Sequence, residues 1–559
     1  MQKKKSQHVQ KTTQKTQKVT KKRSVSTRKG SLIKDVFVGA GFTYIESEGK
    51  HISVSKQDGE IDYIFMWENV IVLCEETSGK DVSNHFAKKL IYHELIYKNK
   101  KEFFTEYEKI DVSIFNNMKE YNYEDLEVRC LYYSAAKEVS QGTARNSAIL
   151  KVITQEQAQY FAELSKTVGK TSRFELLKFL GISLGSIGQA RISGVGVPSY
   201  FLPALALSSK RTNYPDDFIC VSLYIDPNML LSRSCVFRRD GWQDPNLSYQ
   251  RFIDKKKLAE IRKYLANDGR VFVNNVIVTF PPGVIIKNNK GELLKREDID
   301  SNKLIEVELK DEISTIGIID GQHRVFAYYE GNDDLESKIS QLRQRQNLLV
   351  TGIIFPENYD EEQRVRFEAD LFLSINSNQK PVEPSLKQEI ELIIHPEMPL
   401  AVARAIIKKL AVQGALAGML QTSQFSSPSK IATASIASFV LAPMVRKGGK
   451  LYNSWDSTDK KSLENESHRE EYINYCATGI NSFLGIIASV LELKWKIQKS
   501  GGVLNTNVVA AFIHLYGTSL KSDKVFNKKT LEFLNNFTFT GYGSSKWAAL
   551  SNDIFSHIP

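Results

Sequence analysis

Apolar residues along this chain follow two periods, and the change of period marks the predicted elements. Short continuous or alternating apolar runs predict strands, whereas apolar residues three or four positions apart predict helices. In the first 180 residues both kinds occur in turn. The predicted elements are a helix at 31–41, strands at 42–46 and 51–55, a hairpin with strands 61–66 and 70–74, a helix at 83–98, a strand at 128–134, and helices at 155–167 and 172–179.

A second series of elements follows a glycine-rich stretch at 181–200, which we expect to be a loop. From residue 385 onward the apolar spacing is helical, which predicts a helical C-terminal region packed on the preceding core. The elements predicted between these two points are strand 218–225, helix 254–267, a strand within 269–282, strand 315–319 with a helix from His323, strand 348–355, and a helix carrying Phe367, Leu371 and Phe372.

A chain of 559 residues is too long for one hydrophobic core, so several domains are expected. The pattern predicts a multidomain α/β (α+β) protein with a disordered basic tail at 1–30, domains at 31–180 and 200–385, and the helical region at 386–559. The longest apolar runs, at 431–445 and 480–493, are shorter than a membrane span, so we expect no membrane partner.

The stretch STIGIIDGQHRVFAYYEG, residues 314–331, carries the clearest candidate chemistry. A strand that enters a helix through a glycine turn points backbone N–H groups at one spot, where the helix dipole also favours an anion. His323 and Arg324 could add charged donors there. The residues therefore indicate either a phosphate, nucleotide or DNA-backbone site, or an ordinary turn whose polar side chains satisfy local backbone groups.

The pentapeptide Asp320, Gly321, Gln322, His323, Arg324 resembles the signature of the DGQHR-domain family, which includes DndB-like proteins of DNA modification. That family is similar to the ParB/sulfiredoxin superfamily, whose turn binds nucleotide phosphates. The resemblance covers about residues 200–385 and implies further contact residues. These are Tyr249, Gln250 and Arg251 in one element, and Asn376, Gln379 and Lys380 in the second motif, FLSINSNQKPV.

Two departures from the superfamily pattern limit what this resemblance implies. Gln322 stands where sulfiredoxin has its catalytic cysteine, so reduction of sulfinic acid is not expected. His323 replaces one of the two basic residues of the ParB turn, which leaves the choice of ATP or another NTP open. Asp320 either binds Mg²⁺ beside a phosphate or caps the following helix, and capping is the expectation we favour.

The predicted hairpin places an acidic residue in each strand, Asp62 in the first and Glu75 or Glu76 in the second. This arrangement resembles the core of PD-(D/E)xK nucleases and implies a restriction-endonuclease-like domain in which two carboxylates bind Mg²⁺. The hairpin register decides which glutamate faces Asp62, and we prefer Glu75. The family's lysine is missing two residues later, so Lys80, or Lys88 and Lys89 on the next helix, are the candidates for its role.

The charge of the chain is concentrated at its N-terminus. Residues 1–30 contain 11 basic and no acidic residues, and removing these 11 from the 75 basic residues leaves 64, the same as the number of acidic residues. Such a tail neutralises nucleic-acid phosphates or merely solvates the chain. The five cysteines have no CxxC spacing, which predicts free thiols in a reducing cytoplasm rather than zinc or disulfide sites.

These observations lead to one expected function with two alternatives. We expect a DNA-binding protein of a DNA-modification or anti-phage defence system, which cleaves DNA at the Asp62 site with Mg²⁺ and binds nucleotide or phosphate at the DGQHR motif. The alternatives are a non-catalytic DNA-binding regulator and an NTP-hydrolysing switch. The expected partners are DNA, other proteins of the same operon and further copies of this chain.

Overall fold

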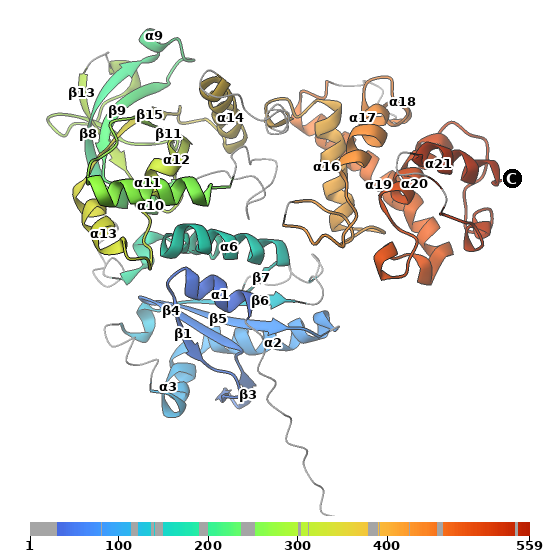
Figure 1. Ribbon diagram of the computed structural model, residues 1–559, viewed down its shortest axis with the longest axis horizontal. Coiled ribbons are helices and arrows are strands. Elements are labelled where there is room, and N and C mark those ends of the chain that lie inside the picture. The colour runs from blue at the N-terminus through green and yellow to red at the C-terminus, as the bar shows by residue number, and fades with distance from the viewer. Residues whose placement is uncertain are drawn as a thin grey trace, which may run out of the picture. The chain divides into compact units, whose positions relative to one another are not determined.

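The computed structural model describes the chain as a mixed α/β protein, over residues 31–79, 81–112, 121–135, 139, 149–188, 200–235, 252–299, 303–310, 312–377, 390, 392–423, 425–455, 462–540, 542 and 546–559. Residues Leu32–Pro559 group into one unit by their contacts, apart from Met1–Ser31. Within that larger unit the described strands form a five-stranded sheet, an eight-stranded sheet and a small two-stranded ribbon (Figure 1).

The five-stranded sheet has the order β1-β4-β5-β6-β7. β1, β4 and β5 pair antiparallel, and β5, β6 and β7 pair parallel, because helices connect β5 to β6 across one face. Its elements are α1 Leu32–Gly39, β1 Thr43–Glu46, β4 Tyr63–Trp67, β5 Val70–Thr77, α2 Val82–Lys98, α3 Lys100–Ile110, β6 Glu127–Ser134, β7 Leu150–Ile153, α6 Gln155–Val168 and α7 Ser172–Phe179; β2 His51–Val54 and β3 Gln57–Glu60 form the ribbon.

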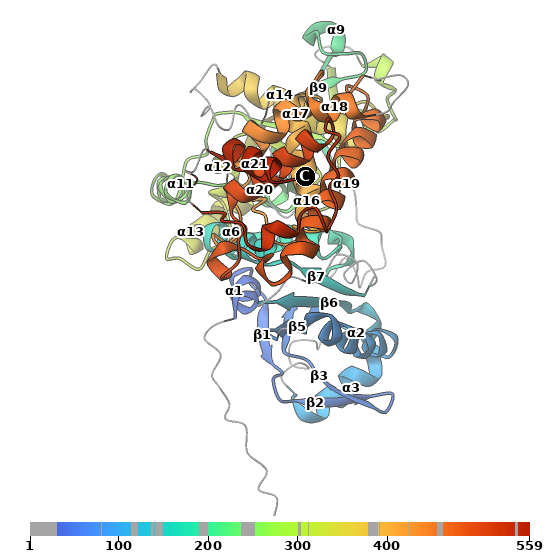
Figure 2. The ribbon, with the colours of Figure 1, turned by 90° about the vertical axis from the view of Figure 1, so that its right-hand side faces the viewer.

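Side chains alternate between the two faces of this sheet and bury both. Phe65 of β4 and Val72 of β5 belong to the cluster that contains α1 and α6, whereas Ile64 and Leu73 belong to the cluster of α2 and α3. The sheet is therefore a layer between helices, as Figures 1 and 2 show. Burial on both faces explains why β4 and β5 are continuous apolar runs in the sequence.

The eight-stranded sheet is mixed, with the order β10-β14-β11-β15-β9-β8-β13-β12. β14, which leads into the DGQHR turn, lies near one edge between β10 and β11. The elements are β8 Tyr200–Ser208, α9 Ser209–Thr212, β9 Ile219–Ile225, α10 Pro227–Arg233, β10 Ser234–Cys235, α11 Lys255–Asp268, β11 Val276–Phe280, β12 Ile286–Asn288, β13 Lys303–Leu309, β14 Ile316–Asp320, α12 Gln322–Phe326, α13 Glu336–Arg345, β15 Leu348–Ile354 and α14 Glu361–Ser377.

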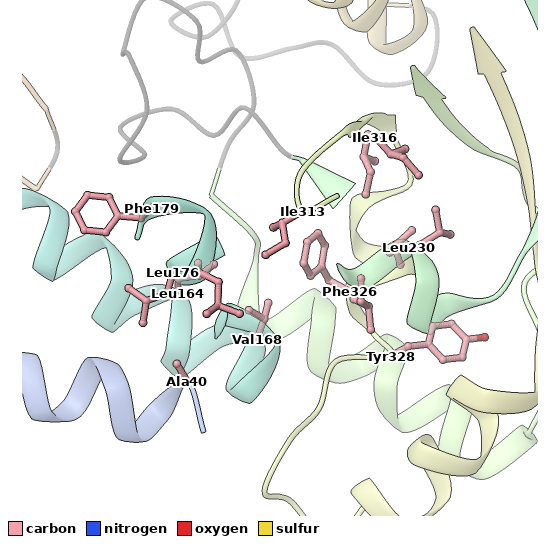
Figure 3. Packing of buried hydrophobic residues seen from close by; sticks show 14 of the residues in the cluster. Ala40, Leu164, Val168, Leu176, Phe179, Leu230, Ile313, Ile316, Phe326 and Tyr328 are labelled. Atoms are coloured by element: carbon pink, nitrogen blue, oxygen red, sulfur yellow. The ribbon is translucent and has the colours of Figure 1, made fainter. Parts of the chain in front are cut away.

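One hydrophobic cluster joins the two sheets. It contains Phe65 of the first sheet, Val168 of α6, Leu230 of α10 and Phe326 of α12. Figure 3 shows Val168, Leu230 and Phe326 among the buried side chains of this cluster. The turn that follows the DGQHR helix is thus packed against the helices that cover the first sheet.

The C-terminal part is helical and has its own core, which extends from Val402 to Ile558. Its elements are α16 Pro399–Val412, a π-helix at Ile436–Leu441, α17 Ala442–Val445, α18 Lys450–Ser454, α19 Glu466–Leu491, α20 Thr506–Ser519 and α21 Trp547–Ser556. Among the described residues, Glu466–Lys494 is the one helix long and apolar enough to cross a membrane. Its apolar side chains, such as Ile480 and Ile487, are buried in this core, which is compatible with a soluble protein.

Most elements predicted from the pattern are present, but several described elements were not predicted, among them α3, β7, α10 and α13. The helical periodicity at 472–497 predicted α19 too far along the chain: the helix begins and ends earlier, at Glu466–Leu491, because a polar first turn precedes the buried stripe. The predicted helix at 431–445 contains a π-helical segment before Pro443. Strands β8 and β13 were not predicted, since each of them exposes alternate apolar residues such as Leu205 and Leu304.

Candidate functional site

The hairpin β4–β5 places the two candidate carboxylates side by side. Tyr63 pairs with Cys74, so the same antiparallel register puts Asp62 directly across from Glu75. Cross-strand neighbours lie on the same face of a sheet. Asp62 and Glu75 therefore share the face covered by α2, at the point where β5 ends.

Glu75 is fully buried, and two side chains of α2 contact its carboxylate. His93 Nε2 lies 2.9 Å from Oε1, and Lys89 Nζ lies 2.6 Å from Oε2. His93 and Lys89 are four residues apart, which places both on the helix face toward the sheet. Burial alone would raise the pKa of Glu75, but these partners outweigh it and the pKa is lowered.

His93 is itself fully buried, and burial alone would lower its pKa. The Cys130 thiol and the Glu75 carboxylate outweigh that effect and raise the pKa of His93 to about 10. The ring is therefore an imidazolium at neutral pH and pairs with the Glu75 carboxylate. The pair keeps a buried glutamate ionised inside an apolar layer, which a solitary carboxylate could not sustain.

Asp62 is less buried than Glu75 and is the acid nearer to solvent. Its Oδ2 accepts a hydrogen bond of 2.7 Å from the backbone N–H of Glu76. Burial, followed by repulsion from the Glu75 carboxylate, raises the pKa of Asp62 to about 7. Two carboxylates that repel each other in this way are a place where a bound cation would lower the energy.

Two further polar side chains, Tyr132 and His85, lie beside the two acids. Tyr132 of β6 is the parallel partner of Glu75, and its hydroxyl lies 2.9 Å from Nδ1 of His85 in the first turns of α2. Burial and the positive charge of Lys89 lower the pKa of His85, so its ring is neutral near pH 7. The site thus combines two acids, one ammonium and one neutral imidazole.

Asp62 and Glu75 are the candidate ligands for a magnesium ion. Mg²⁺ prefers carboxylate oxygens and typically uses one or two of them, leaving further positions to water and substrate phosphate. Glu75 Oε2 is buried beside the Lys89 ammonium at 2.6 Å, so a cation that bound this oxygen would compete with Lys89. No cluster of three or more His, Cys, Asp or Glu side chains suited to a metal is present among the described residues.

The other predicted residues of this site have different positions. Glu76 alternates with Glu75 and lies on the opposite face, where its charge contributes to raising the pKa of Tyr133, so its side chain does not join Asp62. Lys88 is exposed on α2, and Lys89 is the lysine that reaches the acids. Lys80 lies outside the described residues.

The DGQHR turn has the predicted strand, glycine and helix. Gly321 has a φ of 94°, a left-handed conformation that glycine adopts without strain, and α12 starts at the next residue. His323 Nε2 accepts a hydrogen bond of 3.2 Å from the backbone N–H of Asp254. Burial and Lys257 lower the pKa of His323 to about 4, so the ring is neutral.

Arg324 donates from Nη2 to Oδ2 of Asp320 at 2.7 Å. This contact corrects the expectation that Asp320 caps the helix, since no side-chain cap is formed at Gly321 and the carboxylate is bound to arginine instead. Gln322 Oε1 is buried without a hydrogen-bond partner. A phosphate that bound at this turn would compete with the Asp320 carboxylate for the Arg324 guanidinium.

Of the remaining family-motif residues, the structure describes one. The Asn376 side chain, near the end of α14, donates to the backbone carbonyl of Phe372 at 2.8 Å. The other motif residues lie outside the described residues: Tyr249, Gln250, Arg251, Gln379 and Lys380.

Sequence reasoning missed four residues that organise the two predicted sites. His93, His85 and Tyr132 line the acids, and Arg173 of α7 connects the two sheets. The Arg173 guanidinium lies 4.2 Å from the centroid of the Trp67 ring and donates to Glu330 at 2.7 Å. The spacing of His85, Lys89 and His93, each four residues apart on one predicted helix, was the available signal for a polar face.

Comparison with protein-family models, with curated proteins and with solved structures finds no match for this chain.

Proposed function

We propose that this chain is a DNA endonuclease that hydrolyses phosphodiester bonds at Asp62 and Glu75 with a divalent metal ion. The observation that carries the proposal is the convergence of Asp62, Glu75 and Lys89 at one end of the β4–β5 hairpin. Carboxylates from two adjacent strands with an ammonium beside them are what metal-assisted hydrolysis of a phosphodiester requires.

Each residue has a definable role in this proposal. Asp62 and Glu75 would hold Mg²⁺, which supplies a Lewis acid and lowers the pKa of a bound water. The Glu76 backbone N–H orients Asp62, and His93 keeps Glu75 ionised and fixed. The Lys89 ammonium is placed to stabilise negative charge that develops on the phosphate oxygens.

DNA is the substrate that fits the rest of the sequence best. The 11 basic residues in the first 30 add phosphate-binding charge to a body with equal numbers of acids and bases. The DGQHR resemblance supports a place in DNA modification or anti-phage defence, with the second domain sensing DNA or a nucleotide. Cytoplasmic location and the domain types remain part of this proposal.

A non-catalytic DNA-binding regulator is the second candidate. One observation favours it, since His93 and Lys89 already neutralise the Glu75 carboxylate without a metal ion. In that case the buried cluster stabilises a nuclease-like fold that only binds DNA.

A nuclease assay separates the two candidates. Plasmid and linear DNA, with and without modified bases or backbone, are incubated with Mg²⁺ or Mn²⁺ and either wild-type, D62N or E76Q protein. The endonuclease proposal expects cleavage by wild type and E76Q, and loss of cleavage in D62N. DNA binding without cleavage by wild type under both metals would support the regulator, and equal cleavage by D62N would refute the assigned site.

A further inference from the structure

The helical C-terminal region contains a cavity that the proposed nuclease site does not use. Its volume is about 590 Å³, it is open to solvent, and it is bordered by the start of α18, the end of α20 with the turn that follows, and the end of α21. Small-molecule sites in proteins are typically of this size. The lining residues are Lys450, Thr518, Lys521, Ser522, Asp523, Lys524, Phe555 and Pro559.

The cavity is strongly positive, with three lysines and one aspartate on its wall. Burial and the charge of Lys521 lower the pKa of Lys450, so these two ammonium groups repel each other across the cavity. The positive charge of Lys450 also contributes to lowering the pKa of the nearby His514. Asp523 is the one carboxylate side chain among the residues that line the cavity.

Two of the three lysines are held in place by neutral acceptors. Lys450 Nζ donates to Thr518 Oγ1 at 3.1 Å. Lys524 Nζ donates to the backbone carbonyls of Phe555 and Ile558 and lies 5.0 Å from the centroid of the Phe555 ring. These contacts fix the positions of the ammonium groups but do not neutralise their charge, because the acceptors are uncharged.

The remaining wall supplies one hydroxyl and one apolar surface. The Ser522 hydroxyl oxygen accepts from the backbone N–H of Lys524 at 3.1 Å, and its own proton remains a donor for a ligand. The Phe555 ring packs against Phe526 with centroids 6.3 Å apart, and so offers a rigid apolar surface. A ligand that matches this wall carries several negative oxygens and an aromatic or apolar body.

We propose that this cavity binds a phosphorylated small molecule of nucleotide size, with its phosphates between Lys450, Lys521 and Lys524 and its body against Phe555. A phosphate with two negative charges accepts several charge-assisted hydrogen bonds at once, which suits fixed ammonium groups better than a single carboxylate does. The proposal is independent of cleavage at Asp62, because it depends on other residues.

The test is isothermal titration of the full-length protein with ATP, and with inorganic pyrophosphate as a competitor. Three proteins are compared: wild type, the double variant K450M/K521A, and K528A as a matched control. Lys528 is an exposed lysine of the same region whose nearest acid is Glu492, and it does not line the cavity. Circular dichroism and thermal unfolding of each variant establish that the fold is retained.

We expect wild type and K528A to bind ATP, pyrophosphate to displace it, and K450M/K521A to bind at least about tenfold more weakly. Adenosine, which lacks phosphate, should not bind measurably. The proposal is overturned if wild type binds neither ATP nor pyrophosphate at roughly 1 mM, or if the double variant binds ATP as tightly as wild type. It is also overturned if the two lysines affect only the binding of duplex DNA, since the surface would then be a nucleic-acid contact.

Discussion

The Lys89 ammonium on helix α2 lies 2.6 Å from the Glu75 carboxylate at the end of β5. The sequence has no lysine two residues after Glu75, where the resembling nucleases have theirs, yet a lysine from the following helix occupies the space beside the acids. The ammonium also donates to the backbone carbonyl of Glu60 at 2.6 Å, which fixes its position between the ribbon and the hairpin.

If the proposed nuclease activity is present, replacing Lys89 by methionine should abolish most of it. We expect kcat to fall by about 100-fold or more, because a fixed positive group beside the reacting phosphate is lost. K88M is the matched control, since Lys88 is the adjacent exposed lysine on the same helix. Similar rates for K89M and wild type, measured on the same DNA, would remove Lys89 from the mechanism.

Substituting Asp62 by asparagine should change how stability depends on pH. The pKa of Asp62 is about 7 in the folded protein and 3.8 ordinarily, so the folded state binds the proton more tightly. Its contribution to the free energy of unfolding therefore falls as the pH rises from about 4 to about 7. Without metal above that range, D62N should be more stable than wild type, by on the order of 1–3 kcal/mol.

Urea denaturation of both proteins at several pH values measures this difference. Mg²⁺ should stabilise wild type above pH 7 and stabilise D62N much less, because D62N lacks one of the two carboxylates that would bind the cation. A parallel pH dependence in the two proteins would contradict the raised pKa.

Substituting Glu75 by glutamine should destabilise the fold much more than E76Q. The change leaves the buried His93 without its negative partner, and breaking such a pair costs about 3 kcal/mol or more. The folded pKa of His93 is about 10, against an ordinary value of 6.5. The stabilisation is therefore complete below pH 6.5 and is lost as the pH rises through 10.

In E75Q this loss between pH 6.5 and 10 should become shallower, since the glutamine side chain no longer favours the imidazolium. Denaturation curves of wild type, E75Q and E76Q across that range provide the comparison. If E75Q unfolds at the same urea concentration as E76Q, the pairing of Glu75 with His93 contributes little to stability.

A double-mutant cycle should reveal coupling between Arg173 and Glu330. Arg173 is 6% exposed, stacks on Trp67 at the end of β4 and pairs with Glu330 just after the DGQHR helix. We expect R173K, E330Q and the double variant to give a coupling energy of about 1–2 kcal/mol in chemical denaturation. Additive effects of the two changes would mean that the two side chains contribute independently to packing.

Substituting Gly321 by alanine should destabilise the protein by about 1–2 kcal/mol more than G291A does. Both glycines have positive φ values, 94° and 79°, so both variants carry backbone strain. A Cβ at Gly321 would lie 3.0 Å from Arg324 Nη2 and 3.2 Å from Val276, whereas nothing lies within 4 Å of one at Gly291. Thermal unfolding of both variants tests whether the crowding adds to the strain.

The elements that were predicted correctly are those in which the apolar residues follow one regular pattern. The strands β4, β5 and β14 are apolar and buried on both faces, β9 alternates buried apolar with exposed residues, and α1, α6 and α11 have regular apolar spacing. β8 escaped prediction because Pro203 interrupts it and it exposes Leu205 and Leu207, features that are also typical of a loop. α21 follows a polar, glycine-containing stretch that gave no start signal.

The candidate nuclease site was predictable only in part, for a different reason. The sequence predicted that Asp62 and Glu75 lie on one face, because side chains alternate along a strand and both residues belong to one hairpin. Lys89 was one of three open choices because the distance from a helix to a sheet is not visible in the sequence. His93 lies four residues after Lys89, but apolar core residues of a helix have the same spacing. The sequence alone therefore did not distinguish His93 from a residue of the core.

The turn between β4 and β5 contains Glu68 and Asn69 and determines more than the hairpin's shape. Asn69 is fully buried; its side chain donates to the carbonyls of Asp125 and Ser186 and accepts from the N–H of Gly188. These hydrogen bonds connect the turn to the loops at Asp125 and at Ser186 and Gly188, which therefore fix the length of the turn. Deleting one residue at this point would shift β5 by one position, so that Glu76 would face Asp62 and α2 while Glu75 turned to the opposite face. The length of this turn thus decides which glutamate belongs to the proposed metal site, with no change to any acidic residue.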